Sequence, residues 1–219
     1  MKKQLFTTAF ALFACAAAHA APCNIAADGD ANSALLAAAR AGDTQNVRCL
    51  LDSGVKVASQ EGSTALILAA FTGNADMARL LLDKGADAKA ADKSGATALM
   101  TALQSNHTDV ARLLIEKGAD VNATQENGST ALMDAALRGH TDIVRLLIKK
   151  GANVNAADKN NATALMAAVK NGHTDTVRLL IAKGANVHAA DKWRSTALRM
   201  AQIAGHPAIV EMLRDAGAK

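Results

Sequence analysis

One period of 33 residues runs through most of this 219-residue chain. The tripeptide Thr-Ala-Leu occurs five times at this spacing, and Gly-Ala and isolated arginines and histidines recur in the same register. Because independent residue types share the spacing, the chain is predicted to consist of copies of one unit that stack and bury their apolar faces on one another. The Thr-Ala-Leu copies begin at Thr64, Thr97, Thr130, Thr163 and Thr196, and the histidines are His107, His140, His173 and His206.

Each period predicts two short helices. After Thr130, apolar residues spaced three and four positions apart lie on one helical face, and Gly139 is placed to end that helix in a left-handed conformation. Asn106 takes the place of this glycine in the preceding unit, which is acceptable because Asn also tolerates that conformation. A second helix is predicted to begin at Thr141, next to an acidic residue that suits a helix N-terminus, and to end at Gly151.

Three motifs in this register, Gly-x-Thr-Ala-Leu-Met, Gly-His-Thr-Asp-x-x-Arg-Leu-Leu-Ile and Gly-Ala-Asn-Val-Asn-Ala, resemble the ankyrin repeat from about Asp28 to Lys219. The family usually has Thr-Pro-Leu-His where this chain has Thr-Ala-Leu-Met, so a pre-set helix start and a hydrogen bond between units are missing. The resemblance implies an all-α solenoid of six stacked helix-turn-helix units with β-turn tips. We expect an N-terminal capping unit at 30–58, internal repeats at 59–91, 92–124, 125–157 and 158–190, and a C-terminal capping unit at 191–219.

The N-terminus predicts export. Lys2 and Lys3 precede an apolar run that leads to a small-x-small cleavage site, Ala18-His19-Ala20. We therefore expect residues 1–20 to be a signal peptide, residues 21–29 to be a short tail, and the mature protein to be periplasmic. Without the two lysines, 22 basic residues stand against 20 acidic ones, and this balance favours neither nucleic acid nor an anionic membrane as a partner.

The cysteines bear on the same prediction. Cleavage before Cys15 would instead leave a protein lipid-anchored in the envelope, because the residues before Cys15 loosely resemble a bacterial lipoprotein box. After cleavage at Ala20, Cys23 and Cys49 remain, and an even pair of cysteines in an oxidising compartment is usually bonded. A Cys23–Cys49 disulfide is therefore predicted to tie the N-terminal tail across the first unit.

In ankyrin proteins the partner usually meets the turn tips and the first helices on the concave side. The resemblance therefore implies that this chain, expected to be a monomer without a cofactor, binds another protein. Trp193 is the candidate anchor because a large exposed ring is often a binding hot spot; in the alternative, it folds back over the last unit. The mixed charges of the tips do not match a phosphate backbone. The predicted tips are Gln60-Glu61, Lys93-Ser94, Glu126-Asn127, Lys159-Asn160 and Lys192-Trp193, and the first helices add Phe71, Asp134 and Arg138.

Neither the repeated histidines nor the repeated methionines predict a reactive site. Stacked helices lie about 10 Å apart, whereas zinc ligands lie about 2.0–2.1 Å from the metal. Equivalent side chains of successive units therefore cannot bind one metal ion together. Each His is interpreted as helping to start its second helix, and Met100, Met133 and Met166 as core residues. The sequence also lacks catalytic signatures such as Gly-x-Ser-x-Gly, so we predict that the protein is not an enzyme. Protection against oxidative or metal stress by the Met and Cys residues is the alternative function.

Overall fold

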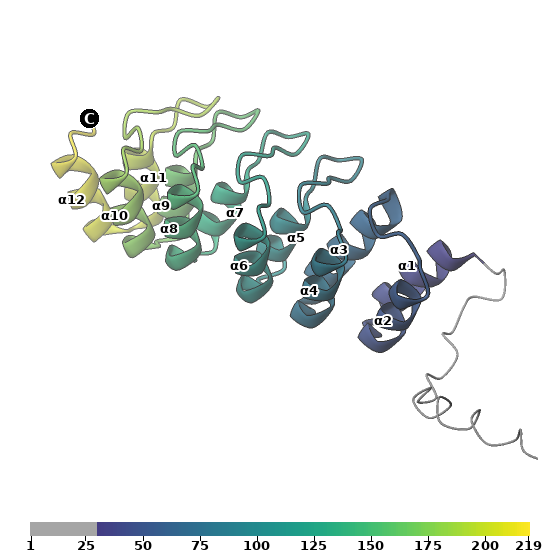
Figure 1. Ribbon diagram of the computed structural model, residues 1–219. Coiled ribbons are helices and arrows are strands. Elements are labelled where there is room, and N and C mark those ends of the chain that lie inside the picture. Colours follow the sequence, from purple (N-terminus) through teal and green to yellow (C-terminus); the bar gives the residue numbers. More distant parts are fainter. Residues whose placement is uncertain (1–29) are drawn as a thin grey trace, which may run out of the picture.

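The computed structural model describes residues 30–219 as a curved row of helix pairs (Figure 1). The predicted signal peptide at 1–20, the tail at 21–29 and Cys23 lie outside the described residues. Within the described chain there are twelve helices and no strand, which confirms the all-α prediction. The helices are α1 (Ala31–Ala41), α2 (Thr44–Asp52), α3 (Gln60–Thr72), α4 (Ala75–Asp83), α5 (Ala98–Gln104), α6 (Thr108–Glu116), α7 (Ala131–Leu137), α8 (Thr141–Lys149), α9 (Ala164–Lys170), α10 (Thr174–Ala182), α11 (Ala197–Ala204) and α12 (Pro207–Asp215).

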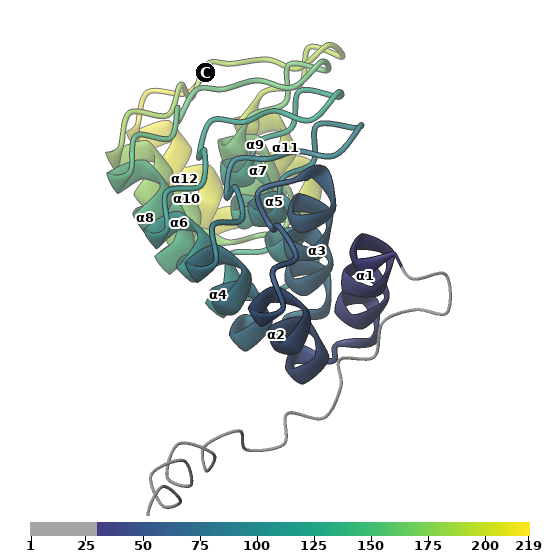
Figure 2. The ribbon, with the colours of Figure 1, turned by 45° about the vertical axis from the view of Figure 1, so that its right-hand side comes forward.

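Consecutive helices form pairs, and each pair stacks on the next. The odd-numbered helices make one row and the even-numbered helices the other, as Figure 2 shows. Neighbouring helices pack more closely in the odd-numbered row than in the even-numbered row, so the stack curves with the odd-numbered helices on its concave side. Buried alanines such as Ala102, Ala135 and Ala168 permit this close approach because their side chains add little volume to the backbone.

The Thr-Ala-Leu motif starts the first helix of four units. Each Thr is an N-cap, and its side-chain oxygen accepts a hydrogen bond from the backbone N–H three residues on, a donor that the helix itself leaves unpaired. These caps are Thr97, Thr130, Thr163 and Thr196, for α5, α7, α9 and α11. Met100, Met133 and Met166 follow three of the caps and are buried, as predicted.

The second unit begins differently, and the prediction of a tip at Gln60-Glu61 is wrong. Helix α3 already starts at Gln60 because Ser59 is its N-cap, with the Ser59 hydroxyl accepting the N–H three residues on at 3.3 Å. Glu61 adds an acidic residue to the first turn, which the helix dipole favours. At the position of Ser59, the next unit has Asp92, whose carboxylate accepts the Ser94 N–H at 2.8 Å and folds a tight turn instead.

None of the repeated histidines caps its helix, contrary to the sequence interpretation, and two of them join units instead. Each histidine precedes a second helix, but none makes a side-chain capping hydrogen bond. Nε2 of His107 instead donates to the backbone carbonyl of Phe71 in the preceding unit, at 3.1 Å. His173 makes the same bond to the carbonyl of Leu137, at 2.9 Å. These two bonds fix the ends of α3 and α7 against the next unit.

Charged residues on the even-numbered helices also connect units. Lys84 pairs with Asp52 and Lys117 with Asp83, each at 2.7 Å, and Arg112 pairs with Asp142. All six side chains are well exposed, so solvent screens these pairs and each contributes little to stability. No helix within residues 30–219 is long and apolar enough to cross a membrane.

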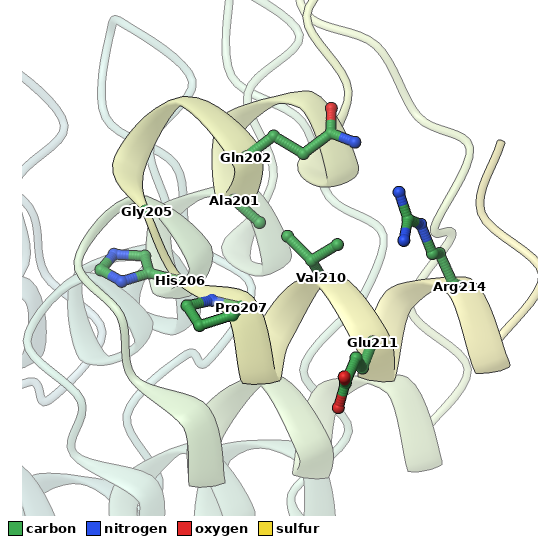
Figure 3. Close-up of a pocket in the computed structure, with 8 residues that line it drawn as sticks. All are labelled: Ala201, Gln202, Gly205, His206, Pro207, Val210, Glu211 and Arg214. Atoms are coloured by element: carbon green, nitrogen blue, oxygen red, sulfur yellow. The ribbon is translucent and has the colours of Figure 1, made fainter.

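The last unit ends the stack with polar side chains. Arg199 occupies the position of the buried Met166, Arg214 occupies that of Ile181, and both arginines are exposed. Residues of α11 and α12 line an open hollow of about 340 Å³. Figure 3 shows the side chains that line it, among them Val210, Gln202 and Arg214. Stacking a further unit on this surface would desolvate charged groups, which is unfavourable.

Candidate functional site

Five of the odd-numbered helices carry a residue at the same position of the repeat, near the C-terminal end of the helix. These five residues form a line along the concave side. Three of these residues, Phe71, Leu137 and Ile203, are large, apolar and exposed by 63%, 43% and 75%. They lie two units apart and alternate with polar residues. Single exposed apolar residues are common on any surface, but these three share one position of the repeat, so we take them as a candidate interaction surface. We call this line the concave row; it consists of Phe71, Gln104, Leu137, Lys170 and Ile203.

The tips of the third to sixth units form a second surface. Backbone hydrogen bonds of 2.9 Å join successive tips, from the Glu126 N–H to the Ser94 carbonyl and onward along the stack. Each tip therefore holds its neighbour in place, and an ordered surface loses less entropy on binding. Asn160 is half-buried, whereas the other predicted tip residues on this surface are exposed: Lys93, Ser94, Glu126, Asn127, Lys159, Lys192 and Trp193.

Trp193 lies on the last of these tips. It is 65% exposed, so most of the ring faces solvent and does not cover the closing unit. Nζ of Lys192 lies 4.5 Å from the centre of the indole ring, a cation–π contact. The backbone N–H of Trp193 donates to the carboxylate of Asp191 at 2.9 Å, which holds the turn. The tip thus presents a large amphipathic side chain from a well-ordered backbone.

Asp134 and Arg138 lie at the middle of the concave side, and both contact α5. Oδ2 of Asp134 accepts a hydrogen bond from Nε2 of Gln104 at 3.0 Å, and the Arg138 guanidinium donates to the Gln104 backbone carbonyl. Burial raises the pKa of Asp134 to about 6, although the Gln104 bond and the charge of Arg138 both act to lower it. A carboxyl group that ionises near pH 6 therefore lies beside the concave row.

A departure from the repeat lies next to this carboxyl group. Nε2 of His140 is buried and has no hydrogen-bond partner among the described residues. In a regular pair of units the histidine ring lies against a glycine, and a Cβ on Gly73 would lie only 2.5 Å from Nδ1 of His107. The residue that faces His140 is Asn106, which carries a side chain at a φ of 67°. Asn106 therefore excludes His140 from the regular position, and burial lowers the pKa of His140.

Sequence reasoning misses this irregularity, although the signal is present. The replacement of glycine by Asn106 predicts only a helix end, because the contact between that position and the next unit's histidine is not visible in one unit. The carbonyl of Gln104, which His140 would reach in the regular arrangement, accepts the Arg138 guanidinium instead. The substitution at Asn106 therefore changes the surroundings of Arg138 and Gln104 on the concave side.

The repeated methionines are inaccessible. Met100, Met133 and Met166 are 1%, 9% and 2% exposed. An oxidant or a soft metal ion needs access to the sulfur atom, and these side chains do not provide it. Within residues 30–219 no group of three or more His, Cys, Asp or Glu side chains lies close enough together to hold a metal ion. These three methionines therefore give no support to the alternative function in stress protection.

The predicted disulfide lies partly outside the described residues. Cys49 lies half-buried on α2. Its predicted partner Cys23 precedes the described chain, as do Cys15 and the predicted cleavage site at Ala20. The disulfide, the export and the alternative lipid anchor therefore stay predictions.

Paired helices, Thr caps and projecting tips in one register are typical of a known family. A family model for ankyrin repeats (3 copies) matches residues 9–92, 84–158 and 154–219. The chain belongs to the ankyrin-repeat family. No curated protein matches its sequence. Ankyrin repeats generally serve as scaffolds for protein–protein interaction, and ankyrin-repeat proteins are typically non-enzymatic. In this ankyrin-repeat protein, the concave row and the tips are the candidate surfaces for such a partner.

Proposed function

We propose that this protein is exported to the periplasm and binds a partner protein there through its concave row and its tips. The partner in this proposal is itself an exported protein. If that partner is an enzyme, a scaffold that covers part of its surface would inhibit it or protect it from unfolding and proteolysis.

The observation that carries the proposal is the placement of the exposed apolar side chains. Among the described residues the large exposed hydrophobics are Phe71, Leu137, Ile203 and Trp193. Three of them share one position of the repeat on the concave side, and the fourth lies on a tip. Burial of such side chains in a complex removes apolar surface from water, which favours binding by about 25 cal/mol per Å².

Variation over a constant scaffold supports the same proposal. The residues that repeat are helix caps, buried alanines and leucines, and the glycines of the turns, all of which maintain the fold. The residues of the concave row differ from unit to unit, and the second tip position varies among Ser, Asn and Trp, whereas the first is Lys in three of the four tips and Glu in the other. A surface whose composition is free of folding constraints can be adapted to one partner.

Site-specific photo-cross-linking tests the proposal. A photoreactive phenylalanine would replace Phe71, Leu137 or Ile203 in the full-length protein expressed in its own host, and envelope fractions would be irradiated. We expect one discrete cross-linked protein from these concave positions. Glu116 and Lys149, which are exposed on the even-numbered helices, are the matched control positions.

The pattern of cross-links shows which side of the solenoid the partner contacts, or whether it contacts any. Cross-links from the concave positions and not from the controls would support the proposed surface. Cross-links only from Glu116 or Lys149 would show that the partner meets the opposite side. The absence of any cross-linked protein from all positions would contradict a protein-binding function in the envelope.

A further inference from the structure

The fourth unit carries a charge at a concave position that is otherwise uncharged. Asp134 lies on α7, and the equivalent residues of the neighbouring units on either side are Thr101 and Ala167. The more distant units have Leu68 and Met200 there. Since the scaffold folds with apolar or small neutral residues at this position, an acidic residue is not required by the fold.

The contacts within the described chain leave the Asp134 carboxylate without an ion pair. Its Oδ2 accepts a hydrogen bond from Gln104, a neutral donor. Arg138, the C-cap of α7, directs its guanidinium to the backbone carbonyl of Gln104 rather than to the carboxylate. The side chain is half-buried, and no hydrogen bond to Oδ1 is found within the described residues.

The helices around Asp134 supply little compensating charge. Helix α5 has no charged residue, and the one charged residue of α9 is Lys170, exposed at its C-terminal end. Helix α8 also packs against α7, and its charged residues, Asp142, Arg145 and Lys149, are all exposed. His140, between α7 and α8, is held towards its neutral form because burial lowers its pKa. The burial of Asp134 outweighs the effect of Arg138, since the pKa of Asp134 is raised rather than lowered. Within the described residues, Arg138 is therefore near the carboxylate but makes no ion pair with it.

We propose that Asp134 accepts a lysine or arginine side chain of the partner, and that apolar residues on both sides of this basic residue contact Phe71 and Leu137. This inference rests on the proposed function of the concave row. A cation that reaches Oδ1 would supply the charge that the fold does not, and a charge-assisted bond in a partly dry site is stronger than a neutral one. Phe71 and Leu137 lie on the two sides of Gln104 along the row, so the apolar residues would exclude water around the pair.

The proposed ion pair also predicts how the affinity depends on pH. A cation binds the ionised carboxylate and not the protonated acid, so affinity must fall as the pH drops through about 6, the pKa of Asp134 in the free protein. Lysine and arginine keep their charge over this range. A partner that binds through a backbone carbonyl would instead favour the protonated acid, and its affinity would rise at low pH.

A selection from random peptides tests the inference without the native partner. A dodecapeptide library displayed on phage would be panned on the mature protein at pH 7.5, and the enriched peptides would be synthesised for affinity measurement. We expect peptides with Lys or Arg between apolar residues. Their affinity should fall at least tenfold on Asp134→Asn, at pH 5, and when the basic residue of the peptide becomes Gln. The amide oxygen of the Asp134→Asn variant can still accept the Gln104 bond, so this variant removes charge and keeps geometry.

The variants separate this inference from the function on which it rests. Changing Asp134 and the peptide's basic residue together should lower the affinity no more than either change alone, because each change removes the same contact. Peptides that lose affinity on Phe71→Ala and Leu137→Ala but bind Asp134→Asn normally would overturn the inference and leave concave binding intact. Peptides that ignore all three changes would overturn both. Enriched peptides without a basic residue, or with higher affinity at pH 5, would also exclude the proposed pairing.

Discussion

The ring of His173 lies against Gly139 in the space that a side chain would need: a Cβ on Gly139 would lie 2.5 Å from Nδ1 of the imidazole. From this position Nε2 of His173 donates to the carbonyl of Leu137, at 2.9 Å. The glycine therefore has two roles, because it ends α7 with a φ of 71° and also admits the histidine of the next unit.

We predict that Gly139→Asn lowers the free energy of unfolding by about 1 kcal/mol, since the displaced His173 loses its hydrogen bond to the exposed carbonyl of Leu137. Asn is chosen because it tolerates a positive φ better than other residues. Gly205→Asn is the matched control, because Gly205 has a φ of 74° and nothing within 4 Å of the new Cβ. Urea denaturation of both variants measures the difference. Equal losses in the two would show that backbone strain, not the His173 contact, is responsible.

Asn106→Gly should have the opposite effect. Removing the side chain opens the position in which His140 could donate to the Gln104 carbonyl, so a buried unpaired nitrogen gains a partner. We expect a gain of about 1 kcal/mol in the free energy of unfolding, reduced by the larger entropy of a glycine in the unfolded chain. The pKa of His140, now lowered by burial, should rise in an NMR titration. The gain should disappear in a His140→Ala background; a gain that persists there would mean that His140 is not involved.

Asp134→Asn should stabilise the protein in a pH-dependent way. The folded pKa of about 6 exceeds the ordinary value of 3.8, so the folded protein binds this proton more tightly than the unfolded chain does. The stabilisation by the protonated form is complete below about pH 4 and is lost as the pH rises through 6. The neutral variant should therefore be more stable than wild type at pH 8 by on the order of 2 kcal/mol, and the difference should shrink towards zero near pH 4. Thermal unfolding at both pH values checks the sign, and an advantage that grew at low pH would contradict it.

The sequence predicts what depends on one unit and misses what depends on two. The caps at Thr97 and Thr130, the left-handed Asn106 and the buried methionines follow from local helix chemistry and from the 33-residue period. The bond between His107 and Phe71 does not, because its two residues belong to different units and meet only when the units stack. The missing tip at Gln60-Glu61 has a local cause, since Ser59 can cap a helix where Asp92 folds a turn.

In the candidate site, too, features of one unit could be predicted and contacts between units could not. Exposure of Trp193 and of Phe71 was predictable because neither position fits the repeating apolar pattern. The environment of Asp134 was not, because it depends on Gln104 and on Arg138 turning to the neighbouring helix. The charge of a residue can be read from the sequence, but its desolvation depends on the residues packed around it.

The predicted Cys23–Cys49 disulfide can be tested on the mature protein. Purified without reductant and treated with an alkylating agent, the protein should show no modified cysteine by intact mass, and reduction before alkylation should show two. Cys49→Ser should lower the free energy of unfolding by roughly 3–4 kcal/mol on the chain-entropy model, for a loop of this length. Two alkylated thiols in the unreduced protein would exclude the bond. Reduced wild type is the control for the loss of packing at position 49.

Trp193→Ala separates binding from folding at the last tip. Because the ring is 65% exposed and its main described contact is with Lys192, its removal should change the free energy of unfolding by no more than about 0.5 kcal/mol. The affinity for the cross-linked partner should fall by about 2 kcal/mol or more if the ring is a hot spot. Trp193→Phe keeps an aromatic ring at the tip and should lose less affinity than the alanine variant. Calorimetry of unfolding and titration of the partner measure the two effects on the same samples. If Trp193→Ala lowers stability while the partner binds unchanged, the ring supports the turn and the anchor lies elsewhere, with the concave row as the remaining surface.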